Sequence, residues 1–432
     1  MAAENVRKHL MLSLGQKGFG ETILGLRLAS ELRATGEQVF LLAHNSNLKL
    51  LEQFGTQRSI ISSAGGPLLQ LYISSCLESF EASSIILSDY FTTTLFFDRF
   101  GLNPQMLSSF GLPIIAIDTW DSDRTSQNMI DLLVGEQGAR SLWPELIRPI
   151  CPVPFLTPRP EARYYASLPR AVTVPRKIRK HLHHTLGVEE SSRAVLFCTA
   201  EWQHPNYDSH GDAARRCAFA LPLLVADYLA RLGDKVHLVH VGPQPLDLKG
   251  RLDGRYHWLP PLRPPEFDTL VASMDLVLSA NMSATTIAKA MASHVPVFVL
   301  QNSVKASSIE EAEAAMAGPL SPDLRKWLED ALPLFPFALW PLGYYRLITP
   351  LLQDNPYLTA LDVAEILDEE RVEAILHSLL FDSSARGDQK HRQKLYLDQV
   401  TALPSGAEAL HTAIETSTAT DGRPGRSLSV PA

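Results

Sequence analysis

The 432-residue chain carries 47 acidic and 39 basic side chains, which give it a net charge of -8. This negative balance argues against general attraction to nucleic acid or to an anionic membrane. Hydrophobic residues make up 45% and charged residues 20% of the chain, as expected of a globular protein with two or three domains.

Four widely spaced cysteines, Cys76, Cys151, Cys198 and Cys217, form no CxxC pair. This spacing argues against a zinc site and against a disulfide scaffold. Their apolar neighbours predict buried free thiols, as in a reducing cytoplasm. The first apolar run is too short for a signal peptide, and no run is long enough to span a membrane. We therefore expect a cytoplasmic protein.

The first third of the chain alternates apolar runs of strand length with a helical pattern. Apolar residues between Thr22 and Thr35 recur near a 3.6-residue period, and this pattern stops at Gly36. Strand-length runs separated by helical lengths predict βαβ units and a parallel sheet. The predicted strands are His9–Gly15, Gln38–Ala43, Ser84–Asp89, Leu112–Asp118 and Arg148–Phe155.

A proline-rich and then basic stretch, Phe155–Gly187, predicts an interdomain linker. Its Arg176–His184 run is either an anion-binding patch or, by preference, a solvated face. A second alternation then begins, with a predicted helix over Ala213–Leu232. Its predicted strands are Ala194–Ala200, Lys235–Gly242, Arg255–Pro260, Asp275–Ala280 and Val295–Asn302.

These two alternations predict an α/β protein of two facing, Rossmann-like, doubly wound domains with a mostly helical C-terminal segment. The expected divisions are an N-terminal domain (1–155), a linker (156–190), a second domain (191–350), C-terminal helices (351–403) and a flexible tail (404–432). In such domains ligands bind at the carboxyl ends of the strands.

A glycine-rich loop, "GQKGFGET" (Gly15–Thr22), lies between the first predicted strand and helix. Gly18 and Gly20 allow close approach of the backbone to a ligand, and the helix start offers unpaired N–H groups. The spacing matches neither the dinucleotide fingerprint nor a P-loop. A tight turn with Glu21 at the favourable end of the helix dipole is the structural alternative.

A second candidate site runs from Tyr256 to Asn302. One predicted strand ends in Asn281, Ser283, Thr285 and Thr286, just before a helix begins. Hydroxyls and free N–H groups at a helix start favour a diphosphate, although an ordinary N-cap would use the same residues.

This stretch resembles the donor-binding segment of GT-B glycosyltransferases that use nucleotide sugars. Trp258 and Pro260 match the family's tryptophan and proline before a long helix, and Val295-Pro296 matches the end of its Gly-Val-Pro. Three positions depart from the family pattern. The phosphate-binding histidine is missing, because Asn281 stands in its place. Lys289 stands where many members carry a ribose-binding glutamate, and His294 replaces the usual glycine.

The resemblance implies roles for individual residues. Asn281 falls on the phosphate-binding histidine, Ser283 on the following glycine, and Thr285 and Thr286 on the pair that touches sugar and phosphate. Gln301 and Asn302 lie near the closing pair that binds sugar hydroxyls. The implied donor is a nucleotide sugar, with a UDP-sugar among the candidates, and neither a metal nor another cofactor is expected.

The resemblance also implies that the glycine loop faces the acceptor. Glu21 stands where the family commonly has a histidine base and would accept the acceptor's proton. Asp118, which ends a predicted strand, would bind the acceptor or orient the base. A metal held by Asp118, Asp121 and Asp123 is a less favoured alternative.

The loop "CTAEWQHPN" (Cys198–Asn206) follows the first strand of the second domain. The fold implied by the resemblance brings it to the donor phosphates, where Trp202, Gln203 and His204 could stack and hydrogen-bond. A structural loop with a half-buried tryptophan is an equal alternative.

The sequence thus predicts a glycosyltransferase that moves a sugar from a nucleotide donor to a small-molecule acceptor. Two alternatives remain. One is a nucleotide-sugar epimerase or hydrolase on the same fold, and the other is a catalytically silent binding or accessory protein. No nucleic-acid partner is expected, and the oligomeric state is left open.

Overall fold

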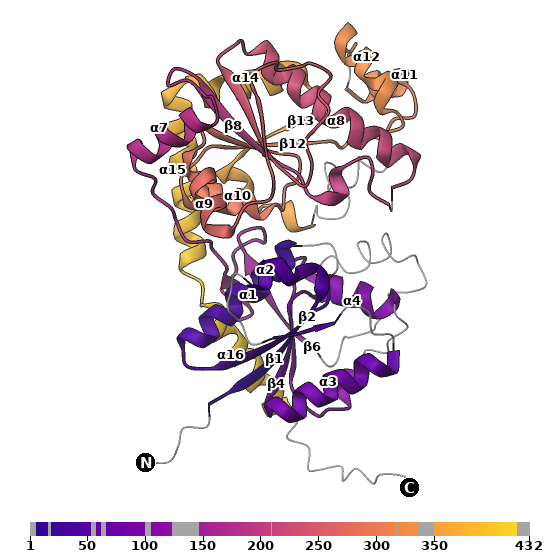
Figure 1. Ribbon diagram of the computed structural model, residues 1–432, viewed down its shortest axis with the longest axis vertical. Coiled ribbons are helices and arrows are strands. Elements are labelled where there is room, and N and C mark those ends of the chain that lie inside the picture. Colours follow the sequence, from indigo (N-terminus) through magenta and orange to yellow (C-terminus); the bar gives the residue numbers. More distant parts are fainter. Residues whose placement is uncertain are drawn as a thin grey trace. The chain divides into compact units, whose positions relative to one another are not determined.

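The computed structural model describes residues 6–15, 19–52, 58–61, 66–99, 105–122, 147–208, 210–316, 318–334 and 350–420. The chain divides into two compact units, one formed by Met1–Ser167 with Ala402–Ala432 and the other by Leu168–Thr401 (Figure 1). The point of division lies inside the expected 156–190 linker. Two predicted site features, Gly18 and the Glu21 side chain, lie outside the described part of the chain.

The first unit is a seven-stranded, wholly parallel sheet in the order β3-β2-β1-β4-β5-β6-β7. Its strands are β1 (Lys8–Ser13), β2 (Gln38–His44), β3 (Arg58–Ile61), β4 (Ser84–Leu87), β5 (Ile114–Ile117), β6 (Ile147–Val153) and β7 (Tyr164–Ala166). Its helices are α1 (Phe19–Ala34), η1 (Asn45–Asn47), α2 (Leu48–Glu52), α3 (Gly66–Phe80), α4 (Tyr90–Arg99), α5 (Gln105–Ser108) and α16 (Gly406–Thr420).

The central strand β1 is buried on both faces of this sheet, as a parallel strand between helical layers should be. Leu10 and Leu12 pack into one core together with Ile73 of α3. Met11 points to the opposite face and packs with residues of α1 and α16, among them Leu410. The near-continuous apolar run in the sequence follows from this two-sided burial.

The second unit is a six-stranded parallel sheet in the order β10-β9-β8-β11-β12-β13. Its strands are β8 (Arg193–Cys198), β9 (Val236–Val241), β10 (Tyr256–Leu259), β11 (Leu276–Ser279), β12 (Val297–Gln301) and β13 (Asp362–Glu365). Its helices are α7 (Arg176–Thr185), η2 (Glu201–Gln203), α8 (Asp212–Arg231), α9 (Pro264–Ser273), α10 (Thr285–Ala292), α11 (Ile309–Met316), α12 (Pro322–Ala331), η3 (Pro356–Ala360), α14 (Glu369–Phe381) and α15 (Ser383–Thr401).

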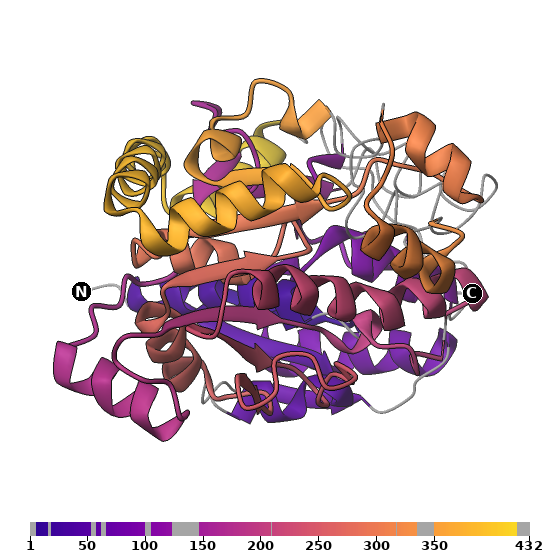
Figure 2. The same ribbon diagram turned by 90° about the horizontal axis from the view of Figure 1, so that it is seen from above.

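Helices cover both faces of this second sheet. Figure 1 shows this sheet edge-on, with α8 and α14 on one side and α9, α10 and α15 on the other; Figure 2 gives the view from above. The buried side of α8 packs with α12 and α14 in one large apolar core. Both units are therefore doubly wound and Rossmann-like, which confirms the predicted fold class.

Four segments differ from the sequence-based expectation. The expected linker contains β7 and α7, and two short strands, β3 and β13, were not predicted. The expected flexible tail is wrong for residues 406–420, which form α16. The tail composition is small and polar, but Ala407 and Leu410 lie one helical turn apart and are buried against the first sheet. That narrow apolar stripe is sufficient to hold the helix.

No helix in the described ranges combines the length and the apolar character needed to cross a membrane.

Candidate functional site

The predicted donor-site residues gather at one edge of the second sheet. Trp202, Gln203 and His204 follow β8, Asn281 and Ser283 follow β11, and Gln301 ends β12. These three strands are neighbours and run parallel, so their carboxyl ends meet at the same edge. This is the edge at which doubly wound domains bind ligands. We call it the carboxyl edge.

The junction between β11 and α10 carries an open helix start. Asn281 Oδ1 accepts hydrogen bonds from the Ser283 backbone N–H (3.1 Å) and hydroxyl (3.0 Å), which fixes the turn before the helix. The N-cap residue is Ala284, which makes no side-chain capping bond. Thr285 and Thr286 follow, and both are partly exposed. An uncapped helix start with partly exposed hydroxyl residues suits an anionic ligand.

The Thr286 hydroxyl has a partner inside the fold as well, because it hydrogen-bonds the Cys198 thiol at the end of β8. Burial raises the pKa of that thiol to about 12, so Cys198 is a neutral structural group. Thr285 is therefore the freer of the two hydroxyls for a ligand. The described cysteines are all free thiols, with Cys198 half-buried and the other three buried.

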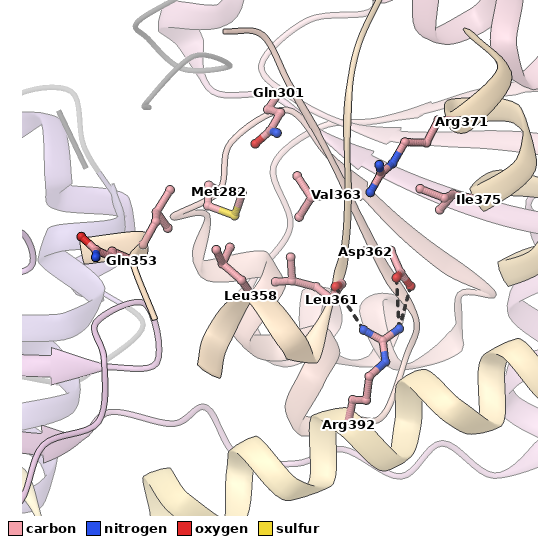
Figure 3. Close-up of a pocket in the computed structure, with 11 residues that line it drawn as sticks. Met282, Gln301, Gln353, Leu358, Leu361, Asp362, Val363, Arg371, Ile375 and Arg392 are labelled. Atoms are coloured by element: carbon pink, nitrogen blue, oxygen red, sulfur yellow. Dashed lines mark hydrogen bonds and ion pairs between the residues drawn. The ribbon is translucent and has the colours of Figure 1, made fainter. Parts of the chain in front are cut away.

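Gln301 and Asn302, the predicted sugar-binding pair, are both nearly buried. Asn302 Oδ1 accepts a hydrogen bond from the Val304 backbone N–H (3.0 Å), which fixes the orientation of this amide. Gln301 borders a pocket of about 650 Å³ that Met282, Leu352, Leu358 and Val363 make largely apolar (Figure 3).

Two polar groups of that pocket are already paired with each other. Arg392 Nη2 donates to both carboxylate oxygens of Asp362, at 3.1 and 3.0 Å, as the dashed lines of Figure 3 show. Gln389 also donates to Asp362 (2.6 Å). Arg371 lines the pocket as well, so its lining combines apolar side chains with a further arginine.

Sequence reasoning missed a buried polar chain behind the loop that follows β8. Thr199 Oγ1 lies 2.9 Å from His204 Nε2 and 2.8 Å from His240 Nε2. On the far side, His240 Nδ1 lies 3.0 Å from the Tyr256 hydroxyl, which accepts the Leu246 backbone N–H at 2.7 Å. The chain links the ends of β8 and β9 to the start of β10. Its signal in the sequence was a pair of histidines, at 237 and 240, inside an otherwise apolar strand.

The fixed donor at Leu246 assigns the protons along this chain. The Tyr256 hydroxyl accepts a hydrogen bond from that N–H and donates one to His240 Nδ1. His240 therefore carries its proton on Nε2 and donates from there to Thr199. Thr199 then donates to His204 Nε2, which leaves His204 with its proton on Nδ1. Burial lowers the pKa of His240 to about 3 and also lowers the pKa of His204. His204 is thus a neutral residue with a defined tautomer.

Trp202 and Gln203 lie on the same loop and are partly exposed. Gln203 Oε1 accepts the Ala200 backbone N–H (2.8 Å), which holds the loop against the end of β8. Trp258 lies on β10, away from β11 and β12 in the strand order, and its indole N–H donates to the Gly242 carbonyl (3.1 Å). Trp258 is 39% exposed as a residue, so part of it remains accessible to a ligand.

The residues at positions 289 and 294, which depart from the predicted pattern, have roles within the fold. Lys289 forms an ion pair with Asp268 of α9, and its ammonium lies over the Phe267 ring. His294 adopts a left-handed backbone with φ of 55°, the conformation that favours glycine.

In the first unit, the described flanks of the glycine loop are held tightly. Gly15 O accepts the Asn47 side-chain amide (2.9 Å), and the Ser13 and Thr22 hydroxyls lie 3.1 Å apart. A side chain at Gly15 would press on Thr92. Gly20 lies in the first turn of α1. The backbone around the loop is thus fixed at the carboxyl end of β1.

Asp118 is almost wholly buried at the end of β5. Its carboxylate accepts the backbone N–H groups of Trp120 (3.2 Å) and Ser122 (2.6 Å) and the Ser122 hydroxyl (3.0 Å). Burial raises the pKa of Asp118 to about 6. The carboxylate therefore holds the turn after β5, an arrangement that favours a structural over a catalytic role. Asp123 lies outside the described residues.

Asp118, Asp121 and Cys151 are near enough to one another to share a metal ion. The donors around them argue against one. Asp121 accepts the Tyr164 hydroxyl (2.5 Å) and pairs with Arg163 (3.4 Å), and a guanidinium beside the site repels a cation. Hydrogen bonds and an ion pair within the fold therefore account for both carboxylates.

Comparison with known proteins places the chain in a family. The profile of a family described as "Family of unknown function (DUF6365)" matches residues 28–419. The chain belongs to DUF6365. No curated protein matches the sequence significantly.

Solved structures similar to the DUF6365 chain share its fold at low identity. A putative UDP-N-acetylglucosamine 2-epimerase from Listeria monocytogenes has a TM-score of 0.56 and 13% identity, covering 98% of this chain and 100% of that one. Anabaena HepE in complex with UDP and glucose has a TM-score of 0.55 and 13% identity, covering 96% and 100%. A glycosyltransferase from Rickettsia africae has a TM-score of 0.53 and 11% identity, covering 97% and 100%. The DUF6365 chain therefore has the GT-B fold that the sequence predicted.

Proposed function

We propose that this DUF6365 protein is a glycosyltransferase that transfers a sugar from a nucleotide-sugar donor to a small-molecule acceptor. The observation that carries the proposal is the open start of α10, where Ala284 provides no side-chain cap and Thr285 is partly exposed. A departing diphosphate would accept hydrogen bonds from this helix start, and the helix dipole would stabilise its charge. The GT-B fold and the glycosyltransferases among its structural neighbours support the proposal.

The reaction needs a base in addition to this helix start. The acceptor oxygen attacks the anomeric carbon of the sugar, the bond from that carbon to the diphosphate oxygen breaks, and the diphosphate leaves with the electron pair. A base takes the acceptor's proton, and we assign this role to Glu21. Hydrogen-bond donors at the diphosphate would stabilise the charge that develops there without a metal ion.

Two further assignments rest on the carboxyl edge. His204 would donate a hydrogen bond from Nδ1 to an oxygen of the nucleotide sugar. Its Nε2 is occupied by the Thr199 hydroxyl, which also contacts His240. Gln301 and Asn302 would bind sugar hydroxyls. The second domain would thus hold the donor, and the first would hold the acceptor.

Binding of UDP to paired variants tests the donor site. Thr285→Val with Thr286→Val should weaken UDP binding in calorimetry by about 1–3 kcal/mol, because the Thr285 hydroxyl that would donate to the diphosphate is lost. Thr269→Val is the matched control, since its hydroxyl lies on exposed α9 and bonds the Pro265 carbonyl (2.9 Å). Equal affinity of all three proteins would remove α10 from the donor site.

A second candidate is a nucleotide-sugar epimerase, which the likeness to the putative Listeria epimerase favours. An epimerase would need accessible carboxylates, whereas Asp89, Asp118 and Asp121 are buried and hydrogen-bonded within the first unit. Product analysis by NMR separates the candidates. A transferase releases UDP and builds a new glycosidic bond only with an acceptor, and an epimerase inverts a sugar carbon without one. Donor binding with no turnover of any kind would favour the accessory-protein alternative.

A further inference from the structure

A second hollow lies at the opposite edge of the second sheet, where the strands begin. It has a volume of about 930 Å³ and is lined by α7, by the starts of β8 and β12, and by the first turns of α15. We call it the amino-edge groove. The candidate donor residues follow the carboxyl ends of the same strands, so the two sites lie on opposite edges of one sheet.

Two guanidinium groups converge at one end of this groove. Arg193 Nε donates to the Leu380 carbonyl at 2.8 Å, and Arg386 Nη1 donates to the same carbonyl at 2.6 Å. Two like charges held on one oxygen repel each other unless an anion lies near. Neither arginine forms an ion pair within the described residues, and the Arg193 guanidinium also lies 6.0 Å from the centre of the Phe381 ring.

A third cation stands beside them. Lys390 lies four residues after Arg386 on α15, so the two side chains share one face of the helix. It is exposed, lines the groove, and has no ion-pair partner in the described part of the chain. His294 lines the same wall, and its pKa is lowered by burial and by the nearby Lys390 and Lys394.

Other cations of the groove have carboxylate partners. Arg179 pairs with Asp275 at 2.6 Å, and Glu190 pairs with both Lys180 (2.6 Å) and Arg176 (3.4 Å). Glu189 is the remaining acidic residue of the lining. Arg193, Arg386 and Lys390 line the same groove and form no ion pair within the described residues, in a protein whose net charge is -8.

Capping of α14 is the simplest structural explanation for the two arginines, because Leu380 lies in its last turn and cations are favourable there. That explanation uses one N–H of each guanidinium, whereas each has five. It also leaves Lys390 without a role. An anion in the groove would satisfy all three cations at once.

We propose that the amino-edge groove binds a phosphate-bearing anion through Arg193, Arg386 and Lys390. Phosphate oxygens match the planar donors of arginine and the point charge of lysine. The groove volume is that of a small-molecule site. This inference is independent of the proposed transferase activity, because the site lies at the other edge of the sheet.

Chemical protection of Lys390 tests the location of the site. The full-length protein is acetylated with and without inorganic pyrophosphate, and modification is read by mass spectrometry. Pyrophosphate should slow acetylation of Lys390 several-fold and leave Lys177 unchanged, since Lys177 is exposed on α7 but does not line the groove. Equal protection of both lysines, or of neither, would overturn the proposal.

Charge variants test the contribution of the individual cations. In calorimetry with pyrophosphate, Lys390→Gln and Arg386→Gln should each weaken binding by about tenfold, the loss expected for one charge-assisted hydrogen bond. Lys177→Gln removes the same charge outside the groove and should retain the wild-type affinity. The series is repeated in the Thr285→Val, Thr286→Val background, where binding at the amino-edge groove should persist even if the donor-site assignment fails.

The phosphate group could belong to a soluble compound or to a lipid headgroup. Sedimentation with phosphatidylglycerol vesicles distinguishes the two sources. Pyrophosphate binding without vesicle binding supports a soluble ligand, and vesicle binding that Lys390→Gln abolishes supports a headgroup. If Lys390→Gln changes neither measurement, the groove is not an anion site.

Discussion

Thr199 and His240 meet through their side chains at the carboxyl ends of β8 and β9, with 2.8 Å between the Thr199 hydroxyl oxygen and His240 Nε2. This contact makes Thr199 the centre of a buried polar chain, because the same hydroxyl reaches His204. It ties the loop that carries Trp202 and Gln203 to the neighbouring strand. The geometry of the candidate donor site therefore depends on Thr199 and His240, which hold its loop in place.

Tyr256→Phe should destabilise the protein. Loss of the hydroxyl leaves the Leu246 N–H and His240 Nδ1 without their partner, which should cost about 1–3 kcal/mol in the free energy of unfolding. Urea denaturation measures the change. The control is Tyr165→Phe, since the buried Tyr165 hydroxyl has no hydrogen-bond partner in the described structure. That control should be neutral or stabilising, and equal losses in both variants would show that the hydrogen bonds of the Tyr256 hydroxyl do not contribute to stability.

Gly242→Ala should be damaging because the position has no room for a side chain. A Cβ atom there would overlap the Thr199 hydroxyl and would lie 2.6 Å from His240 Nε2. We expect a loss of about 1–3 kcal/mol in thermal unfolding, as for overpacked sites. Gly387→Ala, in helix α15 with open space around it, should instead stabilise by about 0.5–1 kcal/mol. An unchanged melting temperature in Gly242→Ala would show that Thr199 and His240 can move away from the added methyl group.

The buried histidines should make stability fall in acid. His240 has a pKa of about 3 in the folded protein and an ordinary value near 6.5 when unfolded. Between these values the unfolded chain binds a proton that the folded chain does not, so the free energy of unfolding decreases as pH falls from 6.5.

His240→Gln isolates this contribution. It should flatten the dependence of the unfolding free energy on pH by about 1.4 kcal/mol per pH unit, the value for one proton. Urea unfolding between pH 4 and 7 measures the slope. His391→Gln, exposed on α15, is the matched control. An unchanged slope in His240→Gln would mean that His240 is protonated in the folded state.

Glu37→Gln should loosen α16 from the first unit. One Glu37 oxygen lies 2.7 Å from His411 Nε2 on α16, and the other lies 2.6 Å from His9 Nε2 on β1. An amide offers one acceptor in place of two, so the bridge to one histidine is lost. Hydrogen exchange of residues 406–416 should become faster. Glu78→Gln, exposed on α3, should leave exchange unchanged, and equal protection in both variants would exclude the bridge as an anchor.

Glu21→Gln tests the proposed base. The amide keeps the shape of the side chain and removes its ability to accept a proton, so turnover should fall by about 10²–10⁴-fold. Donor affinity and melting temperature should stay unchanged, because the role belongs to the transition state. Near-normal turnover would make Glu21 a helix-start residue, and loss of donor binding would assign the glycine loop to the donor instead.

The sequence was sufficient for the long elements because their patterns reflect burial. The apolar run around Leu10–Leu12 predicts a strand covered on both faces, and the leucines at 24, 28 and 32 of the helix after Thr22 are one turn apart and buried. Strand β13 was missed because its "DVAE" sequence is short and half polar, and it forms only by pairing with β12.

The sequence indicated where on the fold the candidate site lies. It did not indicate most of the contacts between side chains there. The turn residues Asn281 and Ser283 were found from their place between strand and helix. The Thr199–His240–Tyr256 chain joins residues from three strands that are distant in sequence, so their proximity depends on the strand order β10-β9-β8. The same holds for Arg193 and Arg386, which meet only at Leu380.

Helix α16 completes the first unit although it follows the whole of the second in the chain. On the ribosome, residues 168–401 therefore emerge and can fold while the first sheet still lacks one of its covering helices. Helix α1 covers part of the face around Met11, and the part that α16 covers stays exposed until Leu410 has been synthesised. A chain that stops before Gly406 would leave that apolar face exposed, so premature termination close to the C-terminus should turn the N-terminal unit into a target for chaperones and proteases.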